Sequence, residues 1–324
     1  MLNAAIIGLG WWGKRLVQSV KGSSVIRFVR GVSLEPEQVK DFAAEMNFVL
    51  GTSYDDVLAD PAIDAVVLAT PHTKHCAQVE AAAAVRKHVF CEKPFALTAS
   101  DARDAISDCE SADVALGVGH HFRLMPSMTA LHEVVASGEL GTVMHVEGNY
   151  SHDWLAAQPA DNWRSAPEET RAGGMTGMGI HVLDSFTYLA GPIRRVCAIS
   201  KRRVLPIAAG DTTAALVVFA SGATGTLATT LKTPFVWRIA VYGEHAWAES
   251  VSETRLIFCH AGKEPEVKDF QPNNHLGLNL ESFANAALRR GTFHISPQGI
   301  QDTASALDGV FRSVDANGEW QEII

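Results

Sequence analysis

Three short segments carry residue types that could do chemistry together. Gly8, Gly10 and Gly13 follow a G-x-G-x-x-G spacing that begins after the apolar run "AAII" and ends inside the amphipathic stretch "WGKRLVQSV". Lys93 follows the apolar run "HVFC" and precedes a proline, and His181 follows the uncharged, glycine-rich segment "AGGMTGMGI". Glycines that hold a dinucleotide, with a lysine and a histidine that exchange a hydroxyl proton, would support hydride transfer at a carbinol carbon.

The glycine loop has the sequence context that a dinucleotide site needs. A predicted strand precedes it and a predicted helix follows it. Gly8 would permit a tight turn, Gly10 a close approach of backbone to pyrophosphate, and Gly13 close packing of helix on strand. The pyrophosphate would then meet N–H groups at the helix N-terminus, where Trp11 and Trp12 stand. We therefore predict that this loop binds NAD(P).

The choice between NAD and NADP depends on the end of the second predicted strand. The fingerprint expects an acidic residue there, roughly 20 positions after the loop, to bind the ribose diol. In "RFVRGVSLEPE", Ser33 stands at the expected strand tip, Glu35 follows two residues later, and Arg30 is close in sequence. Because serine lacks the charge that would repel a 2′-phosphate, the sequence leans toward NADP. If Glu35 reaches back to the ribose, the cofactor is NAD.

Glu92, Lys93 and Pro94 end another predicted strand. Since proline disfavours the helical conformation of the residue before it, we expect Lys93 to be extended at the carboxyl end of that strand, where ligands bind in open α/β sheets. A lysine beside a cationic nicotinamide would have a lowered pKa, which suits proton exchange with a substrate hydroxyl. The alternative interpretation is a solvated lysine before a turn.

The elements that must position these residues change character near residue 123. Before it, apolar strands alternate with helical patterns, as in "DAVVLAT" followed by "HCAQVEAAAAV", which predicts βαβ units and a parallel sheet. After it, β-rich runs follow one another and two helical patterns close the chain. We predict an α/β protein with an N-terminal Rossmann domain, residues 1–123. Residues 124–324 should form an α+β substrate-binding and oligomerisation domain on a large, mostly antiparallel open sheet.

Composition excludes several classes of protein. The chain has 324 residues, 47% of them hydrophobic and 19% charged, which is enough for two globular domains. The net charge of −9, without blocks of like charge, disfavours nucleic acid as a binding partner. No apolar run approaches the ~20 residues that span a membrane. The N-terminus has the pattern of a strand rather than a signal peptide. Five scattered cysteines favour reduced thiols in the cytoplasm, and we expect no metal site.

The combined motifs resemble the glucose–fructose oxidoreductase and inositol dehydrogenase (Gfo/Idh/MocA) family. The matching segments run in order along the chain: "GLGWWG", "LATPHTKH" at 68–75, "VFCEKPFALT" at 89–98, "GHHFRLMPSM" at 119–128, and "NWR" followed by "GIHVLD". The resemblance implies NAD(P)-dependent oxidation of a secondary hydroxyl of a sugar, cyclitol or related small molecule. It also implies a homodimer or homotetramer formed through the open sheet of the C-terminal domain.

The resemblance further implies roles for individual residues. His72 and His121 stand where asparagine is common in the family. The residues that the resemblance places on the cofactor are Thr70, Pro71, His72, His75, Glu92, Lys93, His121 and Arg123.

The family pattern Asp-x-Gly-x-His has lost its aspartate in this chain, because Gly177 stands four residues before His181. The resemblance implies that Lys93 and His181 act as acid and base at the substrate hydroxyl, without the carboxylate that helps relatives to bind it. The alternative for His181 is a core histidine packed among the apolar residues of its own helix.

Two hypotheses account for Gly177. A carboxylated or aromatic-derived substrate would not favour a carboxylate there, and His152, Arg164 and Arg171 could bind it instead. Alternatively, catalysis has been lost and the protein is a non-catalytic dinucleotide sensor of the same fold. Because Lys93 and His181 are both present, we expect an enzyme.

Overall fold

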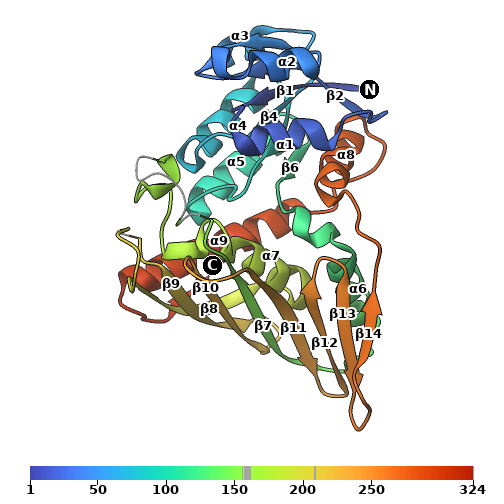
Figure 1. Cartoon of the computed structure of the whole chain (residues 1–324), viewed down its shortest axis with the longest axis vertical. Helices are drawn as coiled ribbons and strands as arrows, with labels where there is room; N and C mark the ends of the chain where they lie inside the picture. Colours follow the sequence, from blue (N-terminus) through green and yellow to red (C-terminus); the bar gives the residue numbers. More distant parts are fainter. Residues whose placement is uncertain (155, 157–161, 208, 324) are drawn as a thin grey trace. The chain divides into compact units, whose positions relative to one another are not determined.

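The computed structural model of the chain describes residues 1–154, 156, 162–207 and 209–323 (Figure 1). Contacts divide the chain into two compact units. The first unit comprises Met1–His121 and Asn274–Ile300, and the second comprises Phe122–Asn273 and Gln301–Ile324.

The first unit is built on a six-stranded parallel sheet of order β3-β2-β1-β4-β5-β6. Its strands are β1 (Leu2–Ile7), β2 (Ile26–Val32), β3 (Val49–Gly51), β4 (Ala65–Leu68), β5 (His88–Cys91) and β6 (Leu116–Val118). Every residue of β4 is buried, as expected of a strand covered on both faces. The strand order reverses between β1 and β4, and in open α/β sheets ligands bind at the carboxyl ends of the strands beside such a reversal.

Helices connect and cover this parallel sheet. They are α1 (Trp11–Ser19), α2 (Lys40–Glu45), α3 (Tyr54–Ala59), α4 (His75–Ala84), α5 (Ala99–Ser111) and α8 (His275–Ala287), with single 3₁₀ turns η1 (Pro36–Gln38), η2 (His72–Lys74) and η3 (His121–Leu124). The predicted Rossmann architecture of the N-terminal part is confirmed.

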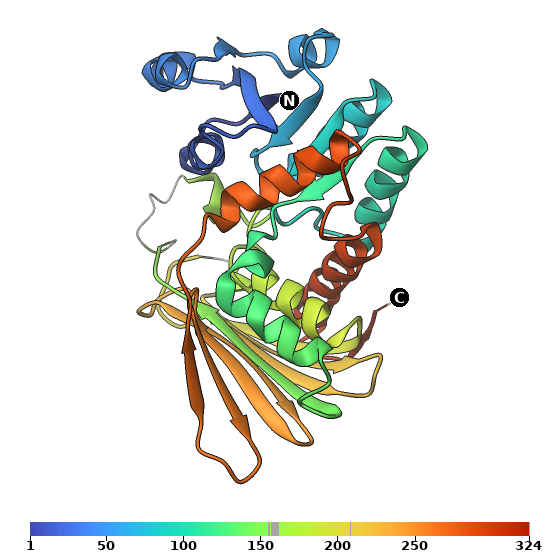
Figure 2. The same ribbon diagram turned by 90° about the vertical axis from the view of Figure 1, so that its right-hand side faces the viewer.

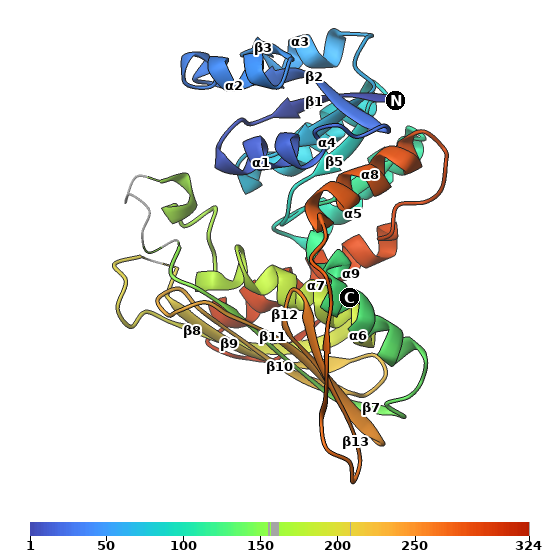
Figure 3. The same ribbon diagram turned by 45° about the vertical axis from the view of Figure 1, so that its right-hand side comes forward.

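Helix α8 joins the first unit although it lies far along the chain. Leu280 and Phe283 of α8 are buried in the same core as the strands of the parallel sheet, and the Phe283 ring lies 5.6 Å from that of Phe90 in β5. Figures 2 and 3 show α8, in orange, beside this sheet. The predicted domain boundaries, 1–123 and 124–324, differ from the compact units because they assign α8 to the C-terminal domain. An apolar helical stripe does not reveal which sheet it will cover.

The second unit is built on a nine-stranded sheet of order β14-β13-β12-β11-β7-β10-β9-β8-β15. All neighbouring strands are antiparallel except β7 and β10, which are parallel. The strands are β7 (Val143–Ser151), β8 (Ile193–Lys201), β9 (Thr212–Phe219), β10 (Thr224–Thr230), β11 (Val236–Gly243), β12 (Ala246–Ser252), β13 (Arg255–His260), β14 (Glu266–Asp269) and β15 (Gln321–Glu322). The prediction of a large, mostly antiparallel sheet is confirmed.

Helices α6 (Pro126–Ala136), α7 (Gly179–Ala190) and α9 (Pro297–Asp315) lie on one face of the nine-stranded sheet (Figures 1 and 2). The short turns η5 (Trp163–Ser165) and η6 (Gly173–Met175) lead toward α7. In the part of the chain that the structure describes, no helix covers the opposite face. None of the described helices is long and apolar enough to cross a membrane.

Candidate active site

The glycine loop joins β1 to α1 at the carboxyl edge of the parallel sheet. Gly8 has φ of +96°, and a Cβ added there would lie 2.6 Å from the Ala69 carbonyl oxygen. A Cβ on Gly13 would overlap the carbonyl oxygen of Gly8. The protein's own backbone packing therefore requires both glycines. A Cβ on Gly10, the N-cap of α1, would meet nothing within 4 Å, so the space before the helix N-terminus fits an approaching pyrophosphate.

This difference separates two alanine variants. Gly10→Ala is expected to keep the wild-type melting temperature, because its φ of −66° suits alanine. It should weaken dinucleotide binding by at least about tenfold, equivalent to about 1.4 kcal/mol, because the methyl group would stand where the pyrophosphate approaches. Gly13→Ala should lower both melting temperature and affinity. Fluorescence titration with NADH and NADPH, together with thermal melts, measures both quantities. Unchanged affinity in Gly10→Ala would place the pyrophosphate elsewhere.

The residues that bear on cofactor choice lie in the last part of β2 and just after it. The Ser33 hydroxyl accepts a hydrogen bond from the Glu35 N–H at 3.2 Å, and Glu35 itself is exposed. Arg30 is directed elsewhere, since its Nη1 lies 4.0 Å from the Asp60 carboxylate. The guanidinium of Arg30 therefore adds no support for a 2′-phosphate site beside Ser33.

His75 links the carboxyl ends of β4 and β5. Its Nδ1 lies 2.8 Å from the Pro94 carbonyl oxygen and its Nε2 lies 3.1 Å from that of Thr70. The ring is almost fully buried, and the His72 ring lies 5.8 Å from it. Pro71 precedes the short turn η2 that begins at His72. The predicted cofactor segments around Thr70 and Pro94 are thus held side by side within the first unit, with His75 between them.

Lys93 follows β5 beside a buried carboxylate. Its backbone N–H donates to Glu92 Oε2 at 3.2 Å, and the Lys93–Pro94 peptide bond is cis. Glu92 is buried, whereas Lys93 is partly exposed. A Cβ on Gly119 would lie 2.5 Å from Glu92 Oε2, so a glycine at 119 makes room for this carboxylate.

His121 meets a second histidine that the sequence places far away. Its Nδ1 lies 2.9 Å from Nδ1 of His275, at the start of α8, and the two rings stack with centroids 4.9 Å apart. The Trp12 ring of the glycine loop lies 5.5 Å from His121. Burial, together with the charges of His275 and Lys93, lowers the pKa of His121 well below its usual value. The imidazole of His121 is therefore neutral at physiological pH.

Arg123 belongs to the second unit, where its guanidinium binds Asp184. Its Nε lies 2.9 Å from Oδ2 and its Nη2 lies 2.7 Å from Oδ1 of that carboxylate, and both side chains are buried. The Thr303 hydroxyl also donates to Asp184, at 3.3 Å. The assignment of Arg123 to the cofactor stays a prediction, and this pairing favours an anchoring role on α7 instead.

His181 lies in the first turn of α7 and is 4% exposed. Its ring stacks on Phe122 with centroids 4.1 Å apart and an interplanar angle of 18°. The Tyr150 ring meets it edge to face at 5.8 Å. Both contacts lie within the second unit. They hold the imidazole in an aromatic environment at the helix start.

Close packing explains the glycine-rich approach to His181. A Cβ on Gly174 would lie 2.8 Å from Thr229 Oγ1, and one on Gly179 would overlap the Met175 side chain. Burial of nearly the whole segment also explains why it carries no charge. Gly177 is the exception, because it is exposed and a Cβ there would meet nothing within 4 Å.

The three residues predicted to bind an anion do not gather at one place. Arg171 pairs with Asp315 at 2.5 Å, and its guanidinium lies 4.6 Å from the Phe311 ring of α9. His152 and Arg164 instead share the Trp154 side of the unit. The Trp154 N–H donates to His152 Nδ1 at 3.1 Å, and the Arg164 guanidinium lies 5.4 Å from the Trp154 ring.

Tyr150 lies beside His181 and was not singled out from the sequence. It is the next-to-last residue of β7, and its ring lies 5.3 Å from that of His152 as well as beside His181. The alternation in "TVMHVEGNYSH" could have placed Tyr150 on one face of a strand. Only the packing of α7 on β7 shows that this face meets the histidine.

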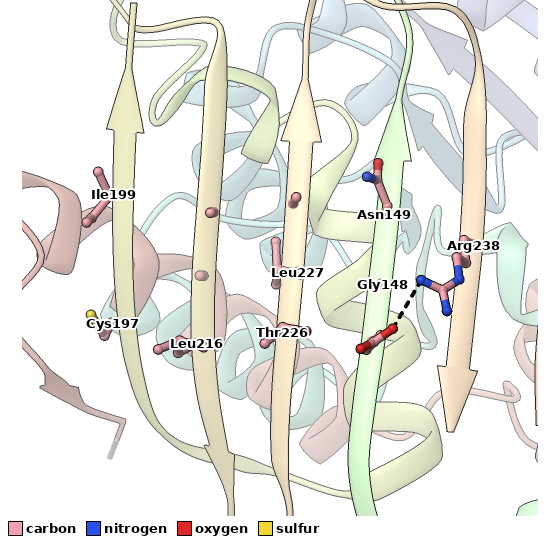
Figure 4. A pocket seen from close by; sticks show the side chains of 12 residues that line it. Gly148, Asn149, Cys197, Ile199, Leu216, Thr226, Leu227 and Arg238 are labelled. Carbon is pink, nitrogen blue, oxygen red and sulfur yellow. Dashed lines mark ion pairs between the residues drawn. The ribbon is translucent and has the colours of Figure 1, made fainter. Parts of the chain in front are cut away.

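A separate hollow lies on the open face of the nine-stranded sheet, the face that no described helix covers (Figure 4). It has a volume of about 480 Å³, and its lining includes Cys197, Ile199, Leu216, Thr226 and Arg238. At one end Arg238 pairs with Glu147 at 3.1 Å. This hollow contains none of the predicted site residues. Among the described residues, no group of three or more His, Cys, Asp or Glu is arranged to hold a metal ion.

Comparisons with known proteins match both units. A family model described as an oxidoreductase family with an NAD-binding Rossmann fold matches residues 2–120, and the model of the GFO/IDH/MocA C-terminal domain matches residues 128–249. D-apiose dehydrogenase of Paraburkholderia graminis is 30% identical over 229 residues, which cover 68% of this chain and 58% of the relative. The 2,7-anhydro-N-acetylneuraminate hydratase of Escherichia coli is 29% identical over 197 residues, 60% of this chain and 50% of the relative.

The chain spans about half the length of the curated relatives it matches. The solved structure of levoglucosan dehydrogenase in complex with NADH and levoglucosan has the same fold, with a TM-score of 0.90, 20% identity and coverage of 99% of each chain. With family models matching both parts of the sequence, the chain belongs to the Gfo/Idh/MocA family of oxidoreductases.

Proposed function

We propose that this protein is an NAD(P)-dependent dehydrogenase. It transfers hydride between the nicotinamide and a secondary hydroxyl or carbonyl carbon of a sugar, cyclitol or related small molecule. The main support is that the open space at Gly10 and the Glu92–Lys93 segment lie at the same carboxyl edge of one parallel sheet. Relatives in the family are named as dehydrogenases of D-apiose and levoglucosan.

The chain's residues divide the work of the proposed reaction. The nicotinamide, when bound, supplies hydride chemistry at C4. Lys93 accepts the substrate hydroxyl proton during oxidation and returns it during reduction, and His181 is its partner as acid and base. The neutral His121 and the buried Glu92 help to hold the cofactor in place. We further propose NADP as the preferred cofactor, supported by the uncharged Ser33 where an acidic residue is expected.

A matched pair of titrations tests this proposal. NADH and NADPH are first titrated against the protein, and the tighter-binding couple is then assayed at the nicotinamide absorbance band with levoglucosan, D-xylose, D-apiose, inositol and carboxylated sugars. The proposal expects turnover with at least one substrate. Tight dinucleotide binding without turnover of any would favour the alternative, a dinucleotide-sensing regulatory protein, which the loss of a carboxylate at Gly177 supports.

Gly177→Asp tests whether the substrate carries a negative charge. We propose a carboxylated or aromatic-derived substrate, supported by Gly177 and by Arg164 beside Trp154. Because Gly177 is exposed and uncrowded, the variant should fold normally. It should lower kcat/KM for carboxylated substrates and raise it for neutral polyols. Steady-state assays of both classes check this. Equal effects on both, or a wild-type preference for neutral sugars, would contradict the anionic substrate.

Arg164 and Arg171 provide a matched comparison for the same question. A charge-assisted hydrogen bond is worth about 1.5–3 kcal/mol, so Arg164→Gln should reduce the preference for a carboxylated substrate by at least about tenfold. Arg171→Gln should leave it unchanged, because Arg171 pairs with Asp315. The reverse pattern would move the anion site to Arg171.

We propose a homodimer or homotetramer formed through the open face of the nine-stranded sheet. Ile199 and Leu216 are about half exposed on this face, beside the hollow in Figure 4. Isolated apolar side chains are ordinary on a surface, but several on a flat sheet face favour an interface. Sedimentation equilibrium tests the oligomeric state.

All five cysteines are free thiols, which supports a reducing compartment such as the cytoplasm.

A further inference from the structure

Tyr150 brings a phenol to the proposed catalytic histidine from a different element of the same unit. His181 comes from α7 and Tyr150 from the end of β7, and their rings meet edge to face at 65°. Phe122 and Trp237 pack on the Tyr150 ring at 5.5 and 5.6 Å, so the ring is held on several sides. Any ligand that touches His181 therefore comes close to a fixed tyrosine ring.

The hydroxyl of Tyr150 differs from those of two other tyrosines in the chain. The Tyr54 hydroxyl donates to the Gln78 carbonyl oxygen at 2.7 Å, and the Tyr242 hydroxyl donates to Glu147 at 3.2 Å. Throughout the described ranges, no hydrogen-bond partner from the protein is found for the Tyr150 hydroxyl. Structural tyrosines usually satisfy a hydroxyl with protein or water, and one left available beside a catalytic group can serve a ligand.

The chemistry of this hydroxyl is that of a donor. Burial raises the pKa of Tyr150 to about 12, so the phenol keeps its proton at neutral pH. The Phe235 ring lies 6.1 Å from the Tyr150 ring and is 68% exposed. A cyclic polyol could use both groups. Its neighbouring hydroxyls can accept a hydrogen bond from Tyr150, and its apolar C–H face can pack on the exposed Phe235 ring.

We propose that Tyr150 is a substrate-positioning residue that donates a hydrogen bond to the hydroxyl next to the reacting carbinol of a cyclic vicinal diol. His181 acts as acid and base at the reacting oxygen, and Tyr150 donates its hydrogen bond to the oxygen on the adjacent carbon. The inference rests on the proposed dehydrogenase function for the identity of the reacting carbon.

Tyr150→Phe keeps the ring and removes only the hydroxyl. The variant should retain the wild-type melting temperature and NAD(P)H affinity and lose about tenfold in kcat/KM for the diol, the effect of one hydrogen bond. With the deoxy analogue, which lacks the neighbouring hydroxyl, wild type and variant should have equal kcat/KM. A purely structural role would affect diol and deoxy analogue alike. Tyr188→Phe is the matched control, since the Tyr188 ring stacks on His132 and Arg123 instead.

A binding measurement separates this inference from the dehydrogenase proposal. In protein labelled with ¹³C at tyrosine Cζ, the Tyr150 signal is the one that Tyr150→Phe removes. Adding levoglucosan or inositol to the NADH- or NADPH-bound protein should move this signal and leave that of Tyr54 in place. Movement without turnover would support the Tyr150 contact and overturn the dehydrogenase. Turnover with an unmoved Tyr150 signal, or with unchanged kcat/KM in Tyr150→Phe, would overturn the inference alone.

Discussion

Replacing Lys93 with alanine is expected to lower turnover by about 10²- to 10⁴-fold, the usual contribution of a general acid or base. Lys93 is partly exposed after β5, beside the buried Glu92, at the edge of the parallel sheet where ligands of this architecture bind. Removal of its amine takes away the proposed proton acceptor without disturbing the glycine loop. Dinucleotide affinity and melting temperature should therefore stay near wild type.

Initial rates at the nicotinamide band, with cofactor titration alongside, measure this effect. Lys40→Ala is a suitable control, because Lys40 is exposed and pairs with Glu37 at 2.8 Å on the helical surface of the same unit. The control should keep wild-type turnover. If Lys93→Ala also turns over normally with the true substrate, Lys93 takes no part in proton transfer.

The second large effect is expected at Asp184. Asp184→Ala leaves the buried guanidinium of Arg123 without its bidentate partner. Removing one member of a buried ion pair lowers the free energy of unfolding by about 3–5 kcal/mol, because the remaining charge is desolvated and uncompensated. That is a large share of the roughly 5–15 kcal/mol that stabilises a folded protein. The variant should melt at a much lower temperature.

An exposed pair with the same bidentate geometry provides the control. Arg255 binds Asp269 through two hydrogen bonds, at 2.7 and 3.1 Å, across the β13–β14 hairpin of the same unit. Both side chains are more than half exposed, so solvent screens the pair and Asp269→Ala should change the melting temperature little. Replacing Arg123 and Asp184 together by leucine should recover part of the stability lost in Asp184→Ala. Equal thermal shifts for Asp184→Ala and Asp269→Ala would show that the Arg123 pair is not a buried anchor.

Much of the first unit could be predicted from the sequence because its signals are local. A strand, a glycine turn and a helix follow one another within the first 19 residues. Gly13 is required by its contact with the Gly8 carbonyl inside that segment, and Gly8 has a φ of +96°, which favours glycine. The alternation of apolar strands and helices then predicts parallel pairing, since parallel neighbours need a crossover. In the second unit, the run of β-rich segments predicted a mostly antiparallel sheet for the same local reason.

Other residues could not be interpreted without long-range contacts. Arg123 follows a segment that resembles a cofactor motif, yet its guanidinium binds a carboxylate 61 positions away. His121 meets His275 across 154 positions, and Arg171 pairs with Asp315 across 144. Side chains of this length reach partners in several directions, and sequence spacing does not select among them.

The sequence by itself determined the kinds of element in this protein and their order. It also determined the short motifs whose contacts lie within a few residues. Both follow because hydrophobic periodicity and the need for glycine act locally. The tertiary structure alone decided which surfaces those elements share. It assigned α8 to the parallel sheet, tied Arg123 to α7, and brought Tyr150 to His181. An apolar stripe or a charged group specifies only that it needs a partner. Which partner it meets is settled by the packing of the whole chain, where burial and electrostatic pairing are satisfied together.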